Sequence, residues 1–156
     1  MRLEKNTAAP PFCLPDHNGN TVCLKDFLGS KVLVYFYPRA NTPGCTTQAC
    51  SLRDAWKELK QAGVTVIGIS PDNVAAQKKF AEKFNLNFAL LADEDHAVAD
   101  AYAVWVEKSL YGRKYFGVLR SSFLVGEDGK IIEAWYKIAP KDTIPKALQA
   151  LNNVMG

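Results

Sequence analysis

Residues 31–50 read KVLVYFYPRANTPGCTTQAC, and they combine the signal of a strand with that of a helix. The run from Lys31 to Tyr37 is almost entirely apolar, β-branched or aromatic, which is typical of a strand buried on both faces. Thr42 is a good N-cap, and Pro43 suits the first position of the helix that follows. The sequence therefore predicts Cys45 in the first turn of a helix, close to the C-terminal end of a buried strand, where reactive groups of α/β proteins collect.

Strand and helix signals alternate along the rest of the chain. Apolar residues at helical spacing from Ala49 to Leu59 predict one helix that ends near Gly63. The stretch 104–117 has no clean period and is predicted to be a loop or insertion. The remaining elements are predicted as hairpins of 12–14 with 21–24 and of 121–125 with 130–136, strands at 64–70 and 88–91, and helices at 75–84, 97–102 and 143–155. This order indicates an α/β class, a thioredoxin-like fold with a mixed central sheet and an added N-terminal β-hairpin.

Length and composition favour a single domain, residues 1–156, because a chain of this size buries a full core without staples. The net charge of +3 is scattered, which gives no reason to expect binding to nucleic acid or to an anionic membrane. The N-terminal residues are charged and lack the apolar segment of a secretory signal. The longest apolar run is too short to cross a bilayer. We therefore expect a cytoplasmic protein.

The predicted position of Cys45 has chemical consequences. The partial positive charge of a helix N-terminus favours a thiolate over a thiol. The Thr42 hydroxyl, one turn back, is able to cap the backbone N–H of Cys45 or to hydrogen-bond near its sulfur. A thiolate held among such donors attacks the O–O bond of a peroxide and becomes a sulfenic acid. The alternative is a plain helix cap with a buried, inert cysteine.

Cys50 lies five residues further along the same predicted helix. Helix geometry separates the two Cα atoms by about 8.7 Å and about 140° around the axis. A disulfide needs Cα atoms within about 7 Å, so a Cys45–Cys50 bond requires the first turns of the helix to unwind. Cys50 is thus either a transient partner of Cys45 or one more residue of the helix face.

The spacing Pro38-x-x-x-Thr42-x-x-Cys45 resembles the active-site motif of the peroxiredoxins. The string from 35 to 50 resembles the bacterioferritin comigratory protein, or peroxiredoxin Q, subgroup, as do 12–16, 68–70, 91–96 and 120–124. The resemblance implies that Cys45 is the peroxidatic cysteine, that Thr42 hydrogen-bonds peroxide and thiolate, and that Pro38 shields the pocket wall. It also implies that Arg120 stabilises the thiolate and orients the peroxide, and that Cys50 resolves the sulfenic acid as an intramolecular disulfide.

This resemblance implies a thiol-dependent peroxidase that reduces hydrogen peroxide and organic hydroperoxides, with a thioredoxin or glutaredoxin as reductant and a monomeric state. Residue 48 is Gln where many relatives have Glu, which puts a carboxylate–Arg pair from that position in question. Two other functions stay open. One is a redox-responsive binding or chaperone protein switched by oxidation of Cys45. The other is a disulfide oxidoreductase, which the lack of a Cys-x-x-Cys motif disfavours.

Cys13 and Cys23 flank the turn of the N-terminal hairpin. A two-residue turn at Asn18-Gly19 would place them on opposite faces, whereas a three-residue turn would pair them directly. We expect the first case, with two unrelated, reduced residues. The two histidines and four cysteines lack zinc-ligand spacing, and no glycine loop suited to phosphate is visible. We therefore expect neither a metal nor a cofactor.

Overall fold

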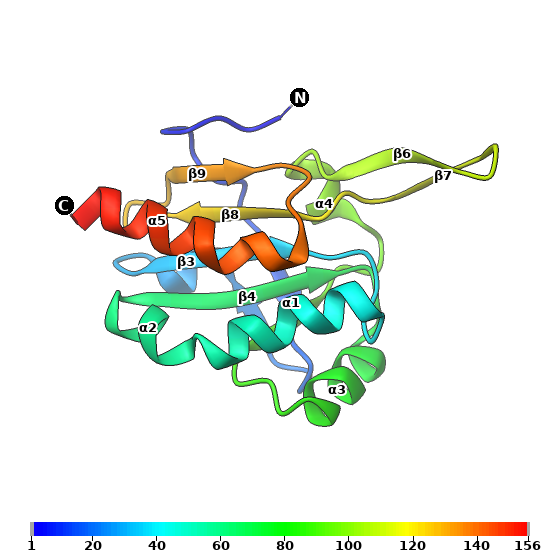
Figure 1. The fold of residues 1–156 in the computed structure, drawn as a ribbon, viewed down its shortest axis with the longest axis horizontal. Helices are drawn as coiled ribbons and strands as arrows, with labels where there is room; N and C mark the ends of the chain where they lie inside the picture. The colour runs from blue at the N-terminus through cyan, green and yellow to red at the C-terminus, as the bar shows by residue number, and fades with distance from the viewer. Residues whose placement is uncertain (1, 156) are drawn as a thin grey trace.

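A computed structural model describes residues 2–155 of the chain (Figure 1). Its centre is a five-stranded sheet in the order β5-β4-β3-β8-β9. The strands are β3 (Lys31–Phe36), β4 (Val64–Ser70), β5 (Ala89–Ala92), β8 (Ser121–Val125) and β9 (Ile131–Trp135). β3 pairs in parallel with β4 and antiparallel with β8, so the sheet is mixed, as the sequence predicted. Neighbouring β4 and β5 are also parallel.

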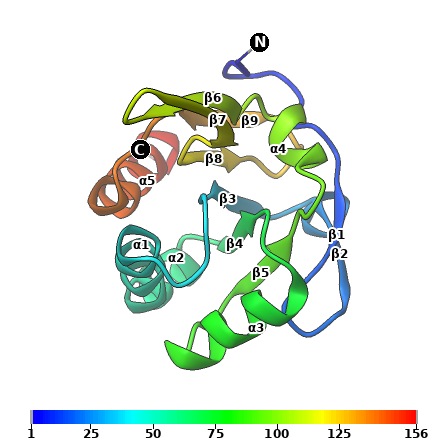
Figure 2. The same cartoon turned by 90° about the vertical axis from the view of Figure 1, so that its right-hand side faces the viewer.

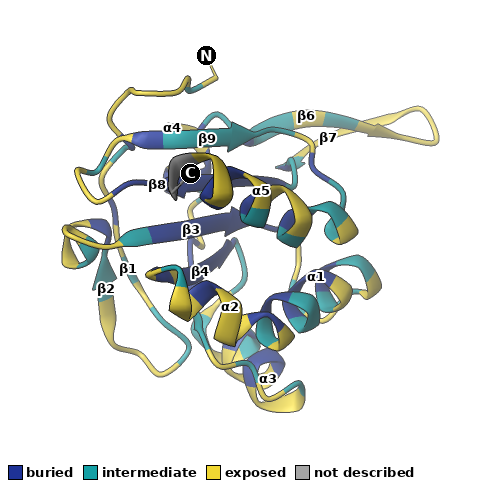
Figure 3. Cartoon of the chain, turned by 60° about the vertical axis from the view of Figure 1, so that its left-hand side comes forward, coloured by how far each residue is buried: buried dark blue, intermediate teal, exposed yellow. Residues whose placement is uncertain are grey.

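Alternate side chains of β3 enter two separate cores. Val32, Val34 and Phe36 pack on one face of the sheet, together with the short helix α4 (Ala97–Ala101) and the N-terminal segment. Leu33 and Tyr35 pack on the other face, against the helices α1 (Pro43–Asp54), α2 (Trp56–Gln61), α3 (Val74–Lys83) and α5 (Thr143–Met155). The sheet therefore lies between two layers (Figure 2), and the central strands are buried on both sides (Figure 3).

The helix predicted from Ala49 to Gly63 is interrupted at Ala55, whose backbone leaves the helical conformation with φ −87° and ψ 7°. The apolar stripe continues across the break, since Leu52, Ala55 and Leu59 are all buried. The carbonyl of Arg53 accepts a hydrogen bond from Asn87 Nδ2 at 3.3 Å, which gives it a partner outside the helix. The prediction of one continuous helix is therefore wrong at this point.

The stretch 104–117 is mainly a β-hairpin, not the predicted loop. Strands β6 (Trp105–Leu110) and β7 (Arg113–Val118) pair antiparallel and project from the body of the molecule (Figure 1). Tyr111 and Gly112 form the turn with φ of 50° and 80°, the sign that two-residue hairpin turns require. Because most of the ribbon is exposed, its sequence lacks the apolar alternation of a half-buried strand.

The N-terminal hairpin consists of β1 (Cys13–Pro15) and β2 (Thr21–Cys23), and the 3-10 helix η1 (Leu24–Phe27) follows it. Pro15 pairs with Thr21, so the turn is longer than two residues and Cys13 lies directly opposite Cys23. The two sulfurs form a disulfide, and the expectation of two unrelated thiols is wrong. The carboxylate of Asp16 accepts the N–H groups of Asn18 and Asn20, each at 2.9 Å, and this fixes the wider turn.

The hairpin lies against β5, an edge strand of the central sheet. Asp16 forms an isolated antiparallel bridge with Leu91, and the N–H of Leu90 donates to His17 Nδ1 at 3.3 Å. Within residues 2–155, no helix has the length and apolar character needed to cross a membrane.

Candidate active site

Cys45 occupies the place that the sequence predicted. β3 leads through a short loop into α1, with Thr42 in extended conformation at the N-cap position and Pro43 as the first helical residue. The N–H of Thr46 donates to the carbonyl of Thr42 at 2.8 Å, which closes the first helical turn. Cys45 is a free thiol in this turn and only 1% exposed. The Cys45 residue is thus placed in the first turn of α1, where a helix leaves N–H groups unpaired.

Arg120 brings a fixed positive charge to this sulfur. The residue lies between β7 and β8, and its Nη2 donates to Cys45 Sγ at 3.2 Å. The N–H of Ile138 donates to the Arg120 carbonyl at 2.9 Å and holds its backbone. A Cβ at Gly44 would lie 3.2 Å from Arg120 Nη2, so a side chain there would displace the guanidinium by a few tenths of an ångström. A permanently charged guanidinium at this distance stabilises a thiolate over a thiol.

Gln48 fixes the orientation of Arg120. Its side chain is fully buried, and its Oε1 accepts from Arg120 Nη1 at 2.6 Å. Its Nε2 donates to the hydroxyl of Thr143, at the start of α5, at 2.8 Å. The guanidinium of Arg120 therefore donates to Cys45 with one nitrogen and to Gln48 with the other. The amide oxygen takes the place that a carboxylate would have had, whereas the contact with Thr143 had no signal in the sequence.

Thr42 does not cap the helix with its side chain, contrary to the expectation. Its hydroxyl instead donates to the carbonyl of Arg39 at 2.9 Å. This bond closes the loop that begins with the half-buried Pro38 and ends at the helix. The N–H of Ala40 donates to Asp72 Oδ2 at 2.7 Å, which ties the loop to the segment after β4.

A network of hydrogen bonds between polar side chains holds Asp72 in place. Ser70 Oγ donates to Asp72 Oδ2 at 2.6 Å, and Gln77 Nε2 donates to Ser70 Oγ at 2.8 Å. The hydroxyl of Tyr37 donates to Gln77 Oε1. Burial raises the pKa of Tyr37, so the phenol stays protonated and acts as a donor. The loop before α1 is thereby positioned by groups at the ends of two parallel strands and on α3.

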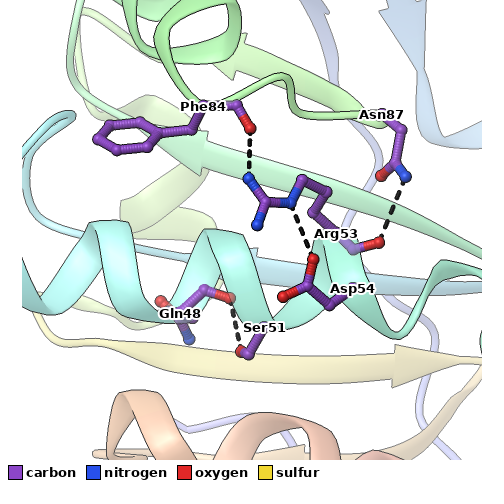
Figure 4. Close-up of polar contacts among 6 residues, drawn as sticks. All are labelled: Gln48, Ser51, Arg53, Asp54, Phe84 and Asn87. Carbon is purple, nitrogen blue, oxygen red and sulfur yellow. Dashed lines mark hydrogen bonds and ion pairs between the residues drawn. The ribbon is translucent and has the colours of Figure 1, made fainter.

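Cys50 is a free, half-buried thiol on the same intact helix. The structure does not bring it into contact with Cys45, in accordance with helix geometry. Beyond Cys50, α1 is anchored to the connection between α3 and β5 (Figure 4). Arg53 Nη1 donates to the carbonyl of Phe84 at 2.6 Å, and Asn87 donates to the carbonyl of Arg53. The end of α1 is therefore held by tertiary contacts that lie beyond both cysteines.

Lys108 of the projecting hairpin is within electrostatic reach of the site. Partial burial lowers its pKa, the positive charge of Arg120 lowers it further, and a negative charge on Cys45 opposes both. This neighbour had no signal in the sequence, which predicts its segment to be a loop.

Comparison with known proteins identifies the family to which this chain belongs. Residues 6–134 match the AhpC/TSA family. Peroxiredoxin Bcp of Escherichia coli K12 is 57% identical over 129 residues, which are 83% of each chain. The chain is a peroxiredoxin of the AhpC/TSA family. It is accordingly a thiol-dependent peroxidase, and its relatives carry the names Bcp and peroxiredoxin Q.

Solved structures support the same relationship for this peroxiredoxin. A cysteine-to-serine mutant of Xylella fastidiosa PrxQ superposes with a TM-score of 0.94 at 26% identity, over 100% of this chain and 99% of that one. The bacterioferritin comigratory protein of Xanthomonas campestris gives a TM-score of 0.88 at 31% identity, over 93% and 92% of the two chains. The predicted thioredoxin-like peroxiredoxin fold is thereby confirmed.

Proposed function

We propose that Cys45 is the peroxidatic nucleophile of this peroxiredoxin. The observation that carries the proposal is the 3.2 Å contact between Arg120 Nη2 and Cys45 Sγ at the N-terminus of α1. The thiolate attacks one oxygen of the hydroperoxide, so that an S–O bond forms and the O–O bond breaks. The alkoxide or hydroxide that leaves takes a proton, and Cys45 becomes a sulfenic acid. Arg120 stabilises both the thiolate and the charge that develops on the leaving oxygen.

Thr42 and Pro38 shape the pocket in this proposal. The Thr42 hydroxyl bonds the Arg39 carbonyl in the resting state, and it lies on the loop that the peroxide has to approach. Its lone pairs stay available to the O–H of a hydroperoxide while it donates to that carbonyl. Pro38 forms the wall of the pocket where β3 passes into this loop.

Cys50 resolves the sulfenic acid after the first turns of α1 unwind. Its thiolate attacks Cys45 Sγ, the S–S bond forms, and the sulfenic oxygen leaves as water. The unwinding stays local, because only end-of-helix hydrogen bonds are given up and the contacts of Arg53 with Phe84 and Asn87 hold the far end. A dithiol protein of the thioredoxin or glutaredoxin type then reduces the Cys45–Cys50 bond.

We take hydrogen peroxide and organic hydroperoxides as the substrates. The alkyl peroxide reduction activity described for the Xanthomonas campestris relative supports the organic class. The enzyme in this proposal is a monomer of one domain. It works in the cytoplasm, because its regeneration needs a compartment that maintains reduced dithiol proteins.

The deciding experiment compares peroxide turnover in Cys45→Ser, Cys50→Ser and a Cys13→Ser/Cys23→Ser control. Cys45→Ser is expected to lose all turnover, while the control retains most of it. Cys50→Ser is expected to react once, accumulate sulfenic acid, and turn over only when a small thiol resolves it. Retained turnover in Cys45→Ser would overturn the assignment of the nucleophile.

The resolving step has its own test. Mass spectrometry of peroxide-treated, alkylated wild type under non-reducing conditions should find a peptide that links Cys45 to Cys50. A link from Cys45 to Cys13, to Cys23 or to another subunit would refute the route through Cys50 and leave the nucleophile intact. Amide exchange of the oxidised protein should increase over the first turns of α1, from about Thr42 to Cys50, while the anchored end at Arg53 stays protected.

A further inference from the structure

The Cys13–Cys23 disulfide lies at a position where two strands approach most closely. The N–H of Leu24 donates to the carbonyl of Phe12 at 3.0 Å, and the N–H of Asp16 donates to the carbonyl of Asn20 at 2.8 Å. These bonds mark hydrogen-bonded pairs on either side, so Cys13 and Cys23 form a non-hydrogen-bonded pair. Closing the disulfide therefore needs no rearrangement of the hairpin.

This disulfide is separate from the peroxidatic cysteine. The N-terminal segment packs on one face of the sheet, whereas Cys45 and α1 pack on the other. Cys13 is exposed and Cys23 is half-buried, in contrast to Cys45. A hollow of about 320 Å³ lies beside Cys13, and it is lined by Pro11, Phe12, Cys13 and Lys25. Lys25 brings a positive charge to this hollow that attracts an approaching thiolate, while the carboxylate of Asp26 accepts the N–H of Cys23 at 2.9 Å.

We propose that Cys13–Cys23 is a second redox site of the enzyme, which a dithiol protein opens by thiol–disulfide exchange at the Sγ of Cys13. The proposal rests on the proposed function in one respect, namely that turnover requires such a reductant in the same compartment. Because Cys13 is exposed, that reductant is able to reach this disulfide without unfolding the protein. Exposed disulfides are also the more readily reduced ones, and disulfides in reducing compartments are mostly transient.

The exchange balances in two steps. A thiolate of the reductant attacks Cys13 Sγ, a mixed disulfide forms, and Cys23 leaves as a thiolate that takes up a proton. The second thiol of the reductant then attacks the mixed disulfide and releases Cys13 as a thiol. Two electrons and two protons have passed to the hairpin, and the reductant carries the disulfide. A hydroperoxide reoxidises the two thiols, with an alcohol and water as the products.

The redox state of this site sets how firmly the hairpin covers β5. The cover consists of the bridge between Asp16 and Leu91 and the bond from Leu90 to His17. Reduction removes the covalent link that keeps the two short strands together, so the hairpin opens more often and β5 loses its protection. The change is a measurable local loosening at an edge of the sheet, on the side away from Cys45.

The test uses a Cys45→Ser/Cys50→Ser variant, in which the two hairpin cysteines are the only ones left. It is purified, treated with a reduced thioredoxin-type protein or with buffer, alkylated and weighed by mass spectrometry. We expect no alkylation before reduction and two alkylated cysteines after it, with faster amide exchange at 13–23 and 89–92. Lys25→Gln in this background should slow the thiol–disulfide exchange with the reductant about threefold at low ionic strength.

Two results would overturn the proposal. One is a purified variant in which both cysteines are already alkylated in air, because no disulfide then forms. The other is a disulfide that resists the reductant until denaturant is added, under conditions in which the same reductant fully reduces the disulfides of an unfolded control protein. Since the variant lacks the peroxidatic cysteine, neither result depends on the peroxidase mechanism. A Cys13→Ser/Cys23→Ser variant, whose amide exchange at 13–23 and 89–92 should not respond to the reductant, is the matched control.

Discussion

Replacing Gln48 by Met tests whether the hydrogen bond from Arg120 to Gln48 contributes to the rate of peroxide attack. Met is close to Gln in length and volume but offers no comparable acceptor or donor. The change removes the acceptor of Arg120 Nη1 and the donor to Thr143 at a site with no solvent access. Arg120 keeps its charge, but its guanidinium is free to rotate away from Cys45. Attack should therefore slow while the nucleophile itself remains intact.

The size of the effect follows from the 2.6 Å bond between Gln48 and Arg120. A hydrogen bond to a charged group contributes about 1.5–3 kcal/mol, which corresponds to about 10- to 150-fold in rate if all of it is lost from the transition state. Because Arg120 keeps its charge and is still able to reach Cys45 from its new orientations, we expect a loss near the lower end, about tenfold. The free energy of unfolding should also fall, by about 1–3 kcal/mol for the buried groups left without partners.

The assay measures the first chemical step alone. Reduced enzyme in a Cys50→Ser background is mixed with hydroperoxide, quenched with an alkylating agent at set times, and the oxidised fraction of Cys45 is determined by mass spectrometry. Gln48→Glu is the matched control, because a carboxylate restores the acceptor for Arg120. An attack rate for Gln48→Met within about twofold of the parent would refute a positioning role for Gln48.

Three further changes probe the same pocket. Gly44→Ala places a Cβ 3.2 Å from Arg120 Nη2 and should slow peroxide attack about tenfold. The free energy of unfolding should not fall, because Ala favours the helix more than Gly does. An unchanged rate of attack would contradict this prediction. Thr42→Val, which loses the hydroxyl bound to the Arg39 carbonyl, should slow attack more than Thr42→Ser, and equal rates for the two would argue against the hydroxyl. Arg120→Met should raise the pKa of Lys108 toward 10.5, because a neighbouring positive charge is removed; an NMR titration that shows no change would exclude this coupling.

The start of α1 could be predicted from the sequence because its determinants are local. Thr42 and Pro43 specify an N-cap and a first turn within a few residues, and Cys45 follows at a fixed position. The approach of Arg120 to Cys45 is different, because 75 residues separate the two. A contact between residues so far apart leaves no periodic pattern in the sequence, so only the family resemblance indicated it. The hydrogen bond from Gln48 to Thr143 is equally long-range and had no sequence signal.

Two of the mispredicted elements differ from the expectation for physical reasons that a single sequence leaves open. The pairing of Cys13 with Cys23 depends on one residue of turn length, and the Asp16 carboxylate decides it by binding two backbone N–H groups inside the loop. The β6–β7 hairpin projects from the body, so its side chains do not alternate between core and solvent. Tyr111, 96% exposed at its tip, shows how little burial marks this element.

In the proposed cycle, in which Cys50 resolves Cys45, the anchored end of α1 also determines how the enzyme returns to its resting state. A helix that melts completely has to nucleate again, and nucleation is the costly step, with a statistical weight of about 10⁻³. The contacts of Arg53 with Phe84 and Asn87 preserve the last turns of α1 while its first turns are open. After the Cys45–Cys50 bond is reduced, rewinding is therefore only elongation from an existing template, which takes on the order of nanoseconds per residue. Thiol exchange is slower than this by orders of magnitude, so the pocket around Arg120 reforms as soon as the reductant has left.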